Sequence, residues 1–192
     1  VTGMLEGLGY SFTEQPEGFS RKARMIKSIQ VALYKVALPQ LDELIFLNPD
    51  DPKDLLEKYS IKAKSVHVLG GIGLDLEEYT YQTTPNTKVI NFLFIGRLLK
   101  EKGIHEFVAA AKLVKQDYPN VKFTILGAID ESNPGALKKS ELDKLTSSGI
   151  IEYPGHVDNI ADWIANSHVF ILPSYREGVP RSTQEAMAIG RP

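Results

Sequence analysis

The chain has 192 residues, of which 43% are hydrophobic and 24% are charged, with a formal net charge of −2 and no cysteine. This composition is typical of a globular protein with one or two cores, and it argues against a general nucleic-acid-binding protein, which would carry a basic excess. Without Cys there are no disulfides or thiolate metal sites, and no apolar run approaches the about 20 residues of a membrane-spanning helix. The chain runs from Val1, with no signal-peptide pattern, to Arg191-Pro192, and we expect it to be a piece of a longer protein.

The first 78 residues are predicted to contain two helices and two short strands. Apolar residues recur at helical spacing from about Phe19 to Leu38, and we expect this helix to have a core-facing apolar side: Met25, Ile26, Ile29, Leu33 and Val36. Its start is basic, with Arg21, Lys22, Arg24 and Lys27. Strands are predicted in DELIFLN and SVHVL, with a helix between them that begins at Asp51-Pro52.

The polar segment YTYQTTPNTK has no helical period, and it is predicted to be a linker between two domains, 1–78 and 79–192. Beyond it, apolar strands and helices alternate. Strands are predicted at 89–96, 121–127, 150–153 and 168–174, and helices at 104–116, 136–148, 159–166 and 182–190. This alternation predicts an α/β fold, in which helices cover both faces of a parallel sheet.

Ligands of open parallel sheets bind outside the carboxyl ends of the strands, and the loop GRLLKEKG follows such an end. Gly96 would allow a tight turn there. Arg97 and Lys102 bring two cations near a helix N-terminus, which favours an anion such as a diphosphate. Taken alone, the two basic residues of this loop are better explained as solvated surface cations than as a diphosphate site. The loop also lacks the Walker pattern GxxxxGK[ST].

Two further strand ends carry glycine-containing loops. Gly127 opens GAIDESNPG, where it would let a flat ring approach the backbone or would simply form an exposed turn. In GHVDN, Val157 lies close to the strand end, and Asp158 is predicted to be the N-cap of the next helix.

The stretch SYREGVPRSTQEA contains two glutamates, Glu177 and Glu185. Glu177 lies in a Gly/Pro loop after a buried strand, where a carboxylate suits the hydroxyls of a sugar or a ribose. The N–H groups of Val179, Arg181 and Ser182 suit an anion. Glu185 has an alternative role, because Ser182-Thr183-Gln184-Glu185 fits a capping box that closes the helix N-terminus.

These loops, in this order, resemble those of retaining glycosyltransferases of family 4, which have the two-domain fold called GT-B. The resembling segments are FIGRLLKEKG, VKFTILG and GHVDNIADWIANSHVFILPSYREGVPRSTQEAMAIGRP. GGIGLDLEEY resembles the crossover between the two domains, and TGMLEGLGYSFTE and ELIFLNPDD resemble members that assemble cell-surface polysaccharides. The resemblance implies that 1–78 is the end of the acceptor-side domain with the crossover, and that 79–192 binds the donor.

The resemblance also implies roles for single residues. Arg97 and Lys102 would grip the nucleotide diphosphate, Glu177 would face the donor sugar, and Glu185 would hold the ribose hydroxyls. Other donor contacts would come from Gly96, Gly127, Val157, Gly178, Val179, Arg181 and Ser182. The implied reaction is a metal-independent transfer with retention, without a further cofactor, from a nucleotide diphosphate sugar, with uridine as the first expectation. The implied acceptor is a glycan or a polyprenyl-diphosphate-linked sugar.

Two departures from the family pattern bear on activity. The histidines at 67, 105, 156 and 168 do not match the histidine that many members carry near the reacting sugar, and they are expected to be structural or surface residues. The chain also stops at Pro192, where the family continues with a strand and closing helices, so we expect this piece alone to be inactive.

The alternatives to a transferase are a GT-B nucleotide-sugar epimerase and a non-catalytic domain that binds a nucleotide or a sugar. A dehydrogenase fits poorly because GGIGLD lacks the third glycine of GxGxxG, and a flavodoxin-like signalling domain would not explain the glutamate pair. We expect a cytoplasmic protein. Peripheral contact of its basic helix with the inner face of the membrane is a further hypothesis, and an ordinary helix with a solvated basic side is the simpler one.

Overall fold

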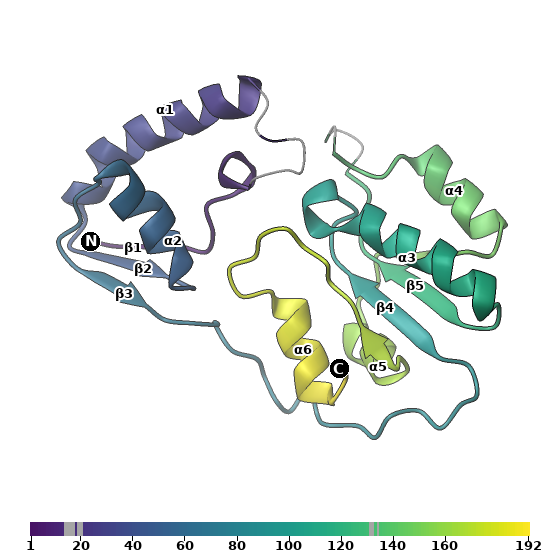
Figure 1. Cartoon of the computed structure of the whole chain (residues 1–192). Coiled ribbons are helices and arrows are strands. Elements are labelled where there is room, and N and C mark those ends of the chain that lie inside the picture. Colours follow the sequence, from purple (N-terminus) through teal and green to yellow (C-terminus); the bar gives the residue numbers. More distant parts are fainter. Residues whose placement is uncertain (14–17, 19–20, 131–132, 134) are drawn as a thin grey trace. The chain divides into compact units, whose positions relative to one another are not determined.

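The computed structural model describes residues 1–13, 18, 21–130, 133 and 135–192, and its chain folds into two compact units (Figure 1). Unit 1 comprises Val1–Gly73 and Tyr175–Pro180, and unit 2 comprises Leu74–Ser174 and Arg181–Pro192. The sequence predicted a division between residues 78 and 79, whereas the units divide between Gly73 and Leu74. The return of 175–180 to unit 1 was not anticipated.

Within the described residues, unit 1 is built on a three-stranded parallel sheet in the order β1 (Thr2–Leu5), β2 (Glu43–Phe46) and β3 (Val66–Val68). The first connection contains the turn η1 (Tyr10–Phe12), helix α1 (Arg21–Ala37) and the turn η2 (Leu38–Gln40); the second contains α2 (Asp50–Pro52), which continues as the helical segment η3 (Lys53–Glu57). The sequence did not predict β1, because its residues TGML include a glycine and form no apolar run.

The core of unit 1 lies on the face of β2 that carries Leu44 and Phe46, where Val31 of α1 and Leu55 of η3 pack. The core-facing side predicted for α1 is wrong for four of its residues, since Met25, Ile29, Leu33 and Val36 are 54 to 72% exposed. Helix α1 instead turns Ala23 and Val31 inward, and the Lys27 ammonium lies 4.8 Å from the centre of the Phe12 ring. The predicted helix start at Phe19 lies outside the described residues.

Unit 2 has a parallel sheet in the order β6-β5-β4-β7, made of β4 (Asn91–Ile95), β5 (Lys122–Leu126), β6 (Glu152–Gly155) and β7 (Val169–Phe170). The turn η4 (Lys100–Lys102) and the helices α3 (Ile104–Asp117), α4 (Lys139–Ser147) and α5 (Ile160–Ala165) lie between the strands, and α6 (Arg181–Ile189) follows β7. Strand β7 is shorter than the predicted 168–174. Ile171 still donates to the Leu93 carbonyl, but Pro173 has no N–H with which to extend the ladder.

Helices cover both faces of the unit 2 sheet. Phe94 packs with Phe107 of α3 and Leu142 of α4. The preceding residue, Leu93, points to the opposite face, where Ile164 of α5 and Ile189 of α6 pack. Both residues are fully buried, which explains why β4 is apolar without a break from Phe92 to Ile95. The predicted α/β class, with parallel Rossmann-like sheets, is confirmed.

Among the helices of the described part of the chain, none combines the length and apolarity that crossing a membrane requires.

Candidate functional site

The strand order of unit 2 determines where a ligand can enter. The chain passes outward from β4 to β5 and β6, and then returns to place β7 on the other side of β4. The loops that follow β4 and β7 therefore leave from neighbouring strands in opposite directions. Such a topological switch point, at the carboxyl edge of the strands, is the usual ligand crevice of open parallel sheets.

Two glycines bring the loops at this edge into backbone contact. A Cβ at Gly127, whose φ is 141°, would lie 2.0 Å from the Gly96 carbonyl oxygen. A Cβ at Gly103, whose φ is 75°, would lie 2.1 Å from the Pro173 carbonyl oxygen. Neither position can take a side chain without displacing backbone, so the loops after β4, β5 and β7 form one closely packed edge.

Gly96 lies at the bend that follows β4. Its φ lies outside the left-handed region, and a Cβ there would make an ordinary 3.6 Å contact with the Phe94 ring. The chain does bend at Gly96, directly after β4, but this bend does not require the conformational freedom of glycine. Its position is fixed by the hydrogen bond from its N–H to the Leu126 carbonyl, at 3.0 Å, and by the approach of Gly127.

The two predicted cations lie in the loop after β4. Leu98 and Leu99 are fully buried and anchor this loop in the core, while Arg97 is exposed. Lys102 is half-buried at the end of η4, immediately before Gly103 and the first residue of α3. The first N–H groups of a helix and its dipole favour an anion at this end. Diphosphate binding by Arg97 and Lys102 stays a prediction.

The loop after β6 presents its backbone at the same edge. Val157 is half-buried and packs against the cluster of Leu93 and Ile164, whereas Asp158 is exposed. Helix α5 begins at Ile160 with Asn159 at its N-cap position. The N-cap role predicted for Asp158 is therefore wrong, because the chain extends one residue further before it turns helical.

Glu185 is a buried carboxylate on the first turns of α6, with a side chain that is 8% exposed. Its Oε1 accepts a hydrogen bond from Arg181 Nε at 2.9 Å, and it is also hydrogen-bonded to the Tyr79 hydroxyl. Burial raises the pKa of Tyr79 most, and the charge and the hydrogen bond of Glu185 raise it further. Because α6 begins at Arg181, Ser182 lies inside the helix and the capping-box alternative does not match the structure.

The contacts of Glu185 leave it able to bind more donors. An ionised carboxylate has about four acceptor positions, and Arg181 and the Tyr79 hydroxyl occupy two of them. Sequence reasoning missed Tyr79, which lies at the start of the predicted linker but is 5% exposed. The available signal was an aromatic residue at the beginning of an otherwise polar segment.

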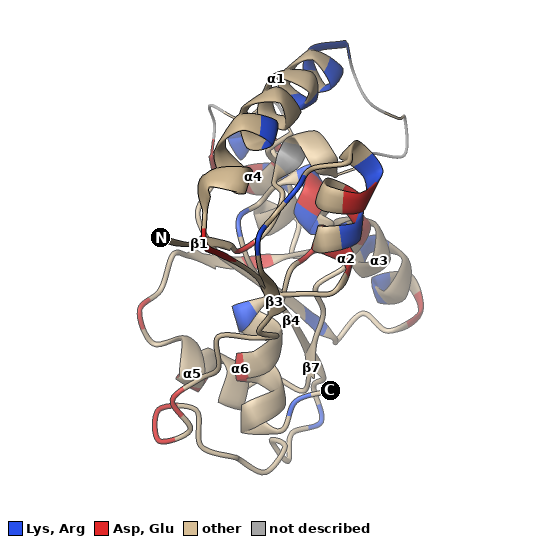
Figure 2. Cartoon of the chain, turned by 90° about the vertical axis from the view of Figure 1, so that its left-hand side faces the viewer, with Lys and Arg blue, Asp and Glu red and all other residues tan. Residues whose placement is uncertain are grey.

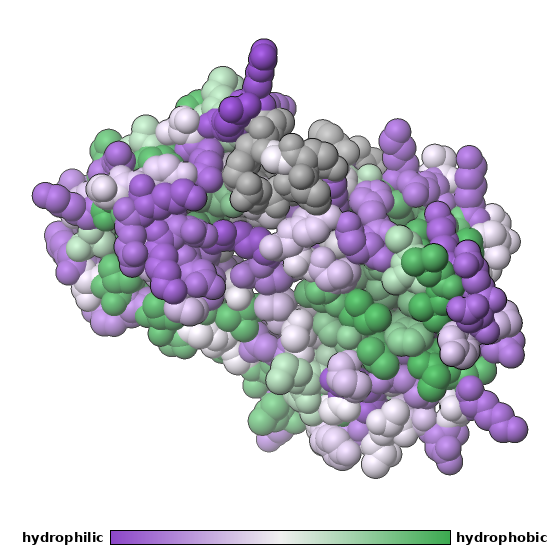
Figure 3. Space-filling model, viewed as in Figure 1, coloured by the Kyte–Doolittle hydropathy of each residue, from purple (hydrophilic) through white to green (hydrophobic). Residues whose placement is uncertain are grey.

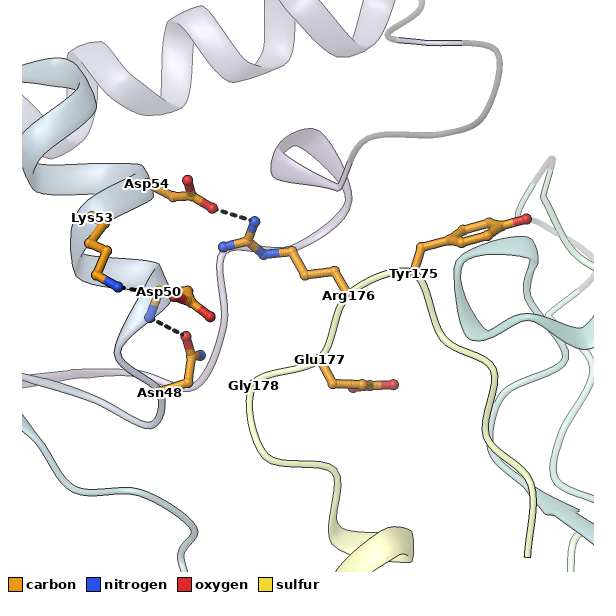
Figure 4. A pocket seen from close by; sticks show the side chains of 8 residues that line it. All are labelled: Asn48, Asp50, Lys53, Asp54, Tyr175, Arg176, Glu177 and Gly178. Atoms are coloured by element: carbon orange, nitrogen blue, oxygen red, sulfur yellow. Dashed lines mark hydrogen bonds and ion pairs between the residues drawn. The ribbon is translucent and has the colours of Figure 1, made fainter.

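Glu177, Gly178 and Val179 belong to unit 1, together with the rest of the loop Tyr175–Pro180. This loop and the segment 48–54 line an open pocket of about 450 Å³. Figure 4 shows the residues that line it: Asn48, Asp50, Lys53, Asp54, Tyr175, Arg176, Glu177 and Gly178. Charged and hydrophilic residues cover α2 on the surface (Figures 2 and 3).

Arg176 connects the loop to α2. Its Nη2 lies 2.5 Å from Asp51 Oδ1, and its Nη1 lies 2.6 Å from Asp54 Oδ2. Burial alone would lower the pKa of Arg176, but the hydrogen bonds and charges of Asp51 and Asp54 outweigh it, so that the pKa is raised. The sequence analysis placed Asp51 only at the start of a helix, and no local pattern links Asp51 or Asp54 to a residue 125 or 122 positions away.

Asn48 fixes the start of α2. Its Oδ1 accepts hydrogen bonds from the N–H groups of Asp50 and Asp51, and its Nδ2 donates to Asp51 Oδ2 at 2.8 Å. The helix therefore begins at Asp50, behind the Asn48 side chain, and not at Asp51-Pro52 as predicted. The sequence NPDD carried this signal, since Asn is a good N-cap, Pro is favoured at the first helical position, and acids follow. Among the described residues, no three His, Asp or Glu side chains gather closely enough to hold a metal ion.

Comparison with known proteins identifies proteins of similar sequence and solved structures of similar fold. Over 98% of its length, the chain is 28% identical to the N,N'-diacetylbacillosaminyl-diphospho-undecaprenol alpha-1,3-N-acetylgalactosaminyltransferase of Campylobacter jejuni, of which it covers 50%. Over 61% of its length, it is 30% identical to the capsular polysaccharide biosynthesis glycosyltransferase CapM of Staphylococcus aureus, of which it covers 30%. The chain therefore spans half or less of the length of these relatives.

Solved structures of similar fold cover the whole chain. Sucrose-phosphate synthase from Thermosynechococcus elongatus matches with a TM-score of 0.75 at 21% identity, and the chain covers 48% of it. HepE from Anabaena, solved in complex with UDP and glucose, matches with a TM-score of 0.73 at 18% identity and 51% coverage. The fold is that of GT-B glycosyltransferases. The family described as "Glycosyl transferases group 1" matches residues 90–192, which is more than half of the chain. The chain is a member of this family of group 1 glycosyl transferases.

Proposed function

We propose that the protein is a glycosyltransferase of polysaccharide assembly. It transfers a sugar from a nucleotide diphosphate sugar, with retention at the anomeric carbon, to a glycan or a polyprenyl-diphosphate-linked acceptor. The observation that carries this proposal is the carboxyl edge of the unit 2 sheet, where two cations, a closely packed glycine edge and a buried carboxylate follow neighbouring strands. Its family membership and the printed activities of its relatives support the same reaction class.

The diphosphate of the donor binds at the loop after β4 in this proposal. Arg97 supplies an exposed guanidinium, and Lys102 an ammonium next to the start of α3. Both cations donate charge-assisted hydrogen bonds to the diphosphate, and such bonds are about twice as strong as hydrogen bonds between neutral groups. A diphosphate at this position also accepts from the first N–H groups of the helix.

The nucleoside binds beside the diphosphate. Gly127 and the Val157 backbone, at the ends of β5 and β6, border the base, and Glu185 accepts hydrogen bonds from the ribose hydroxyls. The complex of HepE with UDP and glucose supports uridine as the base and a hexose as the sugar. Glu177 and the loop residues Gly178 and Val179 contact the sugar.

The chemistry follows from where charge develops. As the bond between the anomeric carbon and the diphosphate oxygen breaks, its electron pair goes to the leaving diphosphate. Arg97, Lys102 and the N–H groups of Arg181 and Ser182 stabilise this charge most in the transition state, which accelerates the step. A leaving phosphate oxygen takes the proton of the acceptor hydroxyl, whose oxygen bonds to the anomeric carbon. The reaction proceeds without a metal or a further cofactor.

Binding of nucleotides to the folded chain tests the donor site. Ligand-observed NMR with UDP, GDP, ADP and their glucose conjugates measures Kd for the parent and for Arg97→Ala and Glu185→Gln. Each lost charge-assisted bond contributes about 1.5–3 kcal/mol, so each variant should weaken the preferred nucleotide by about 10- to 100-fold. Lys122→Ala and Glu152→Gln are matched controls, because this half-exposed ion pair lies at the amino ends of β5 and β6, the opposite edge of the sheet.

Two outcomes would contradict the proposal. The first is a folded chain, verified by circular dichroism, that binds no nucleotide. The second is equal weakening by the site variants and the controls. The non-catalytic alternative predicts the same binding but no sugar transfer by the whole protein, and a turnover assay with a lipid-linked acceptor separates it from the transferase.

Helix α1 supports a second proposal, peripheral contact with an anionic membrane at the cytoplasmic face. Its exposed apolar residues Met25, Ile29, Leu33 and Val36 follow an exposed basic start at Arg21, Lys22 and Arg24, and Figures 2 and 3 show basic and hydrophobic residues together over this helix. Amphipathic basic helices bind anionic lipid surfaces. Sedimentation with phosphatidylglycerol vesicles should capture the parent but not a variant with Gln at the three basic positions, and equal capture would contradict the proposal.

A further inference from the structure

Glu177 lies between two neighbours that are both fastened to unit 1. On one side, Arg176 forms ion pairs with Asp51 and Asp54 at 2.5 and 2.6 Å. On the other side, a Cβ at Gly178 would lie 2.5 Å from the Glu6 carbonyl oxygen, so the loop backbone passes directly over the β1 end. The backbone on both sides of Glu177 is therefore held in place.

The groups that hold Arg176 in place, which we call the Arg176 anchor, are its own planar guanidinium and the carboxylates of Asp51 and Asp54. Asp51 and Asp54 are three residues apart, a spacing that places both on one side of a helix. Asp51 has a side chain that is 2% exposed, and Asn48 orients it through a hydrogen bond to its second oxygen. A guanidinium can satisfy two acceptors with separate N–H groups, which an ammonium cannot do with the same fixed geometry.

The anchor also determines which way Glu177 points. Figure 4 shows the side chains of Arg176 and Glu177 leaving the loop on opposite sides, with Arg176 directed at α2 and Glu177 directed away from it. Holding Arg176 against α2 therefore holds the Glu177 carboxylate in the opposite direction.

We propose that Asp51 and Asp54 are positioning residues for Glu177, which they orient by binding Arg176. This inference rests on the proposed function, in which Glu177 contacts the donor sugar. It extends the site to a helix that no motif of the sequence connected with the glutamate pair. It also gives Arg176, the residue next to Glu177, a defined role that requires arginine and not merely a positive charge.

The variants are chosen to keep the fold. Asp54→Asn changes a carboxylate that is 41% exposed, and Asp51→Asn keeps the shape and one acceptor oxygen of the buried residue. Arg176→Lys keeps the charge but loses the fork. Asp50→Asn is the matched control, because Asp50 lines the same pocket and pairs with Lys53 at 3.3 Å, with a side chain that is 77% exposed.

Two measurements test the inference. Amide hydrogen exchange of the peptide 174–181 reports the anchoring of the loop directly, whatever the chain binds. The ratio of Kd for UDP to Kd for UDP-glucose and UDP-N-acetylglucosamine reports the contribution of the sugar to binding. Thermal unfolding of each variant serves as the check on folding.

The amides of 174–181 should exchange on the order of tenfold faster in the double variant Asp51→Asn/Asp54→Asn and in Arg176→Lys. In Asp50→Asn they should exchange at the same rate as in the parent. The double variant and Arg176→Lys should also reduce the contribution of the sugar to binding, as Glu177→Gln does. When Glu177→Gln is added to one of these two variants, it should cause little further loss, because the effects of coupled residues are not additive. Exchange that matches the parent would overturn the inference. If Glu177→Gln itself leaves the ratio unchanged, the sugar role in the proposed function fails, while the exchange result still decides the anchoring.

Discussion

Replacing Gly127 by alanine tests the closely packed edge on which the donor site depends. The added Cβ would lie 2.0 Å from the Gly96 carbonyl oxygen, and the φ of 141° at this position is one that residues with side chains rarely adopt. Since real Cβ atoms do not approach backbone so closely, the loop after β4 or the end of β5 must move.

The loss of stability has two parts. An unfavourable backbone conformation costs about 1–3 kcal/mol. Displacing the two backbones also weakens the hydrogen bonds from Gly96 N–H to Leu126 and from Gly127 N–H to Gly155, both 3.0 Å long, each of which contributes about 1 kcal/mol. We therefore expect Gly127→Ala to lower the free energy of unfolding by about 3–5 kcal/mol, a large share of the about 5–15 kcal/mol of a typical domain.

Urea unfolding followed by the fluorescence of Trp163 measures this loss, because the single tryptophan of the chain lies on α5 and packs in unit 2. Gly155→Ala is the control, since Gly155 also has a positive φ, 92°, but a Cβ added there would have no other atom within 4 Å. It should lose only about 1–2 kcal/mol. Equal losses for the two variants would refute the steric argument.

Two further predictions concern buried polar groups of unit 2. Arg191 is 2% exposed and donates to backbone carbonyls that include those of Gln82 and Ala165, so Arg191→Met should cost about 2–4 kcal/mol in urea unfolding; a loss as small as that of an exposed residue would contradict this. Burial and Glu185 raise the pKa of Tyr79 above 10.0, so its contribution to stability is present below pH 10 and is lost as the pH rises through the folded-state value. Tyr79→Phe should therefore flatten the fall of the unfolding free energy as the pH rises above about 10, and an unchanged slope would contradict the assignment.

The fold of unit 2 could be predicted because its signals are local. The strand around Leu93 and Phe94 is apolar on both faces, and helical spacing marks α3 after it. Strand β1 escaped prediction because an exposed strand that contains Gly3 has neither an apolar run nor a clear alternation of apolar and polar residues.

Long-range packing accounts for the remaining errors. The apolar stripe of α1 indicated a helix correctly, but nothing local shows that Ala23 and Val31 would turn inward in its place. Tyr79 looked like part of a polar linker, yet its hydroxyl is hydrogen-bonded to Glu185, which is distant along the chain. The anchoring of Arg176 by Asp51 likewise depends on how the chain returns to unit 1.

The central claim, that a nucleotide diphosphate binds at the carboxyl edge of the unit 2 sheet, is tested most directly by mapping backbone amide shifts in ¹H–¹⁵N NMR spectra during titration with UDP, GDP and ADP. The account predicts that one of these shifts the amides of Gly96, Arg97, Gly127 and Val157, while Lys122 and Glu152 at the amino edge stay unchanged. Shifts confined to the amino edge, or no shifts with any of the three nucleotides, would contradict it.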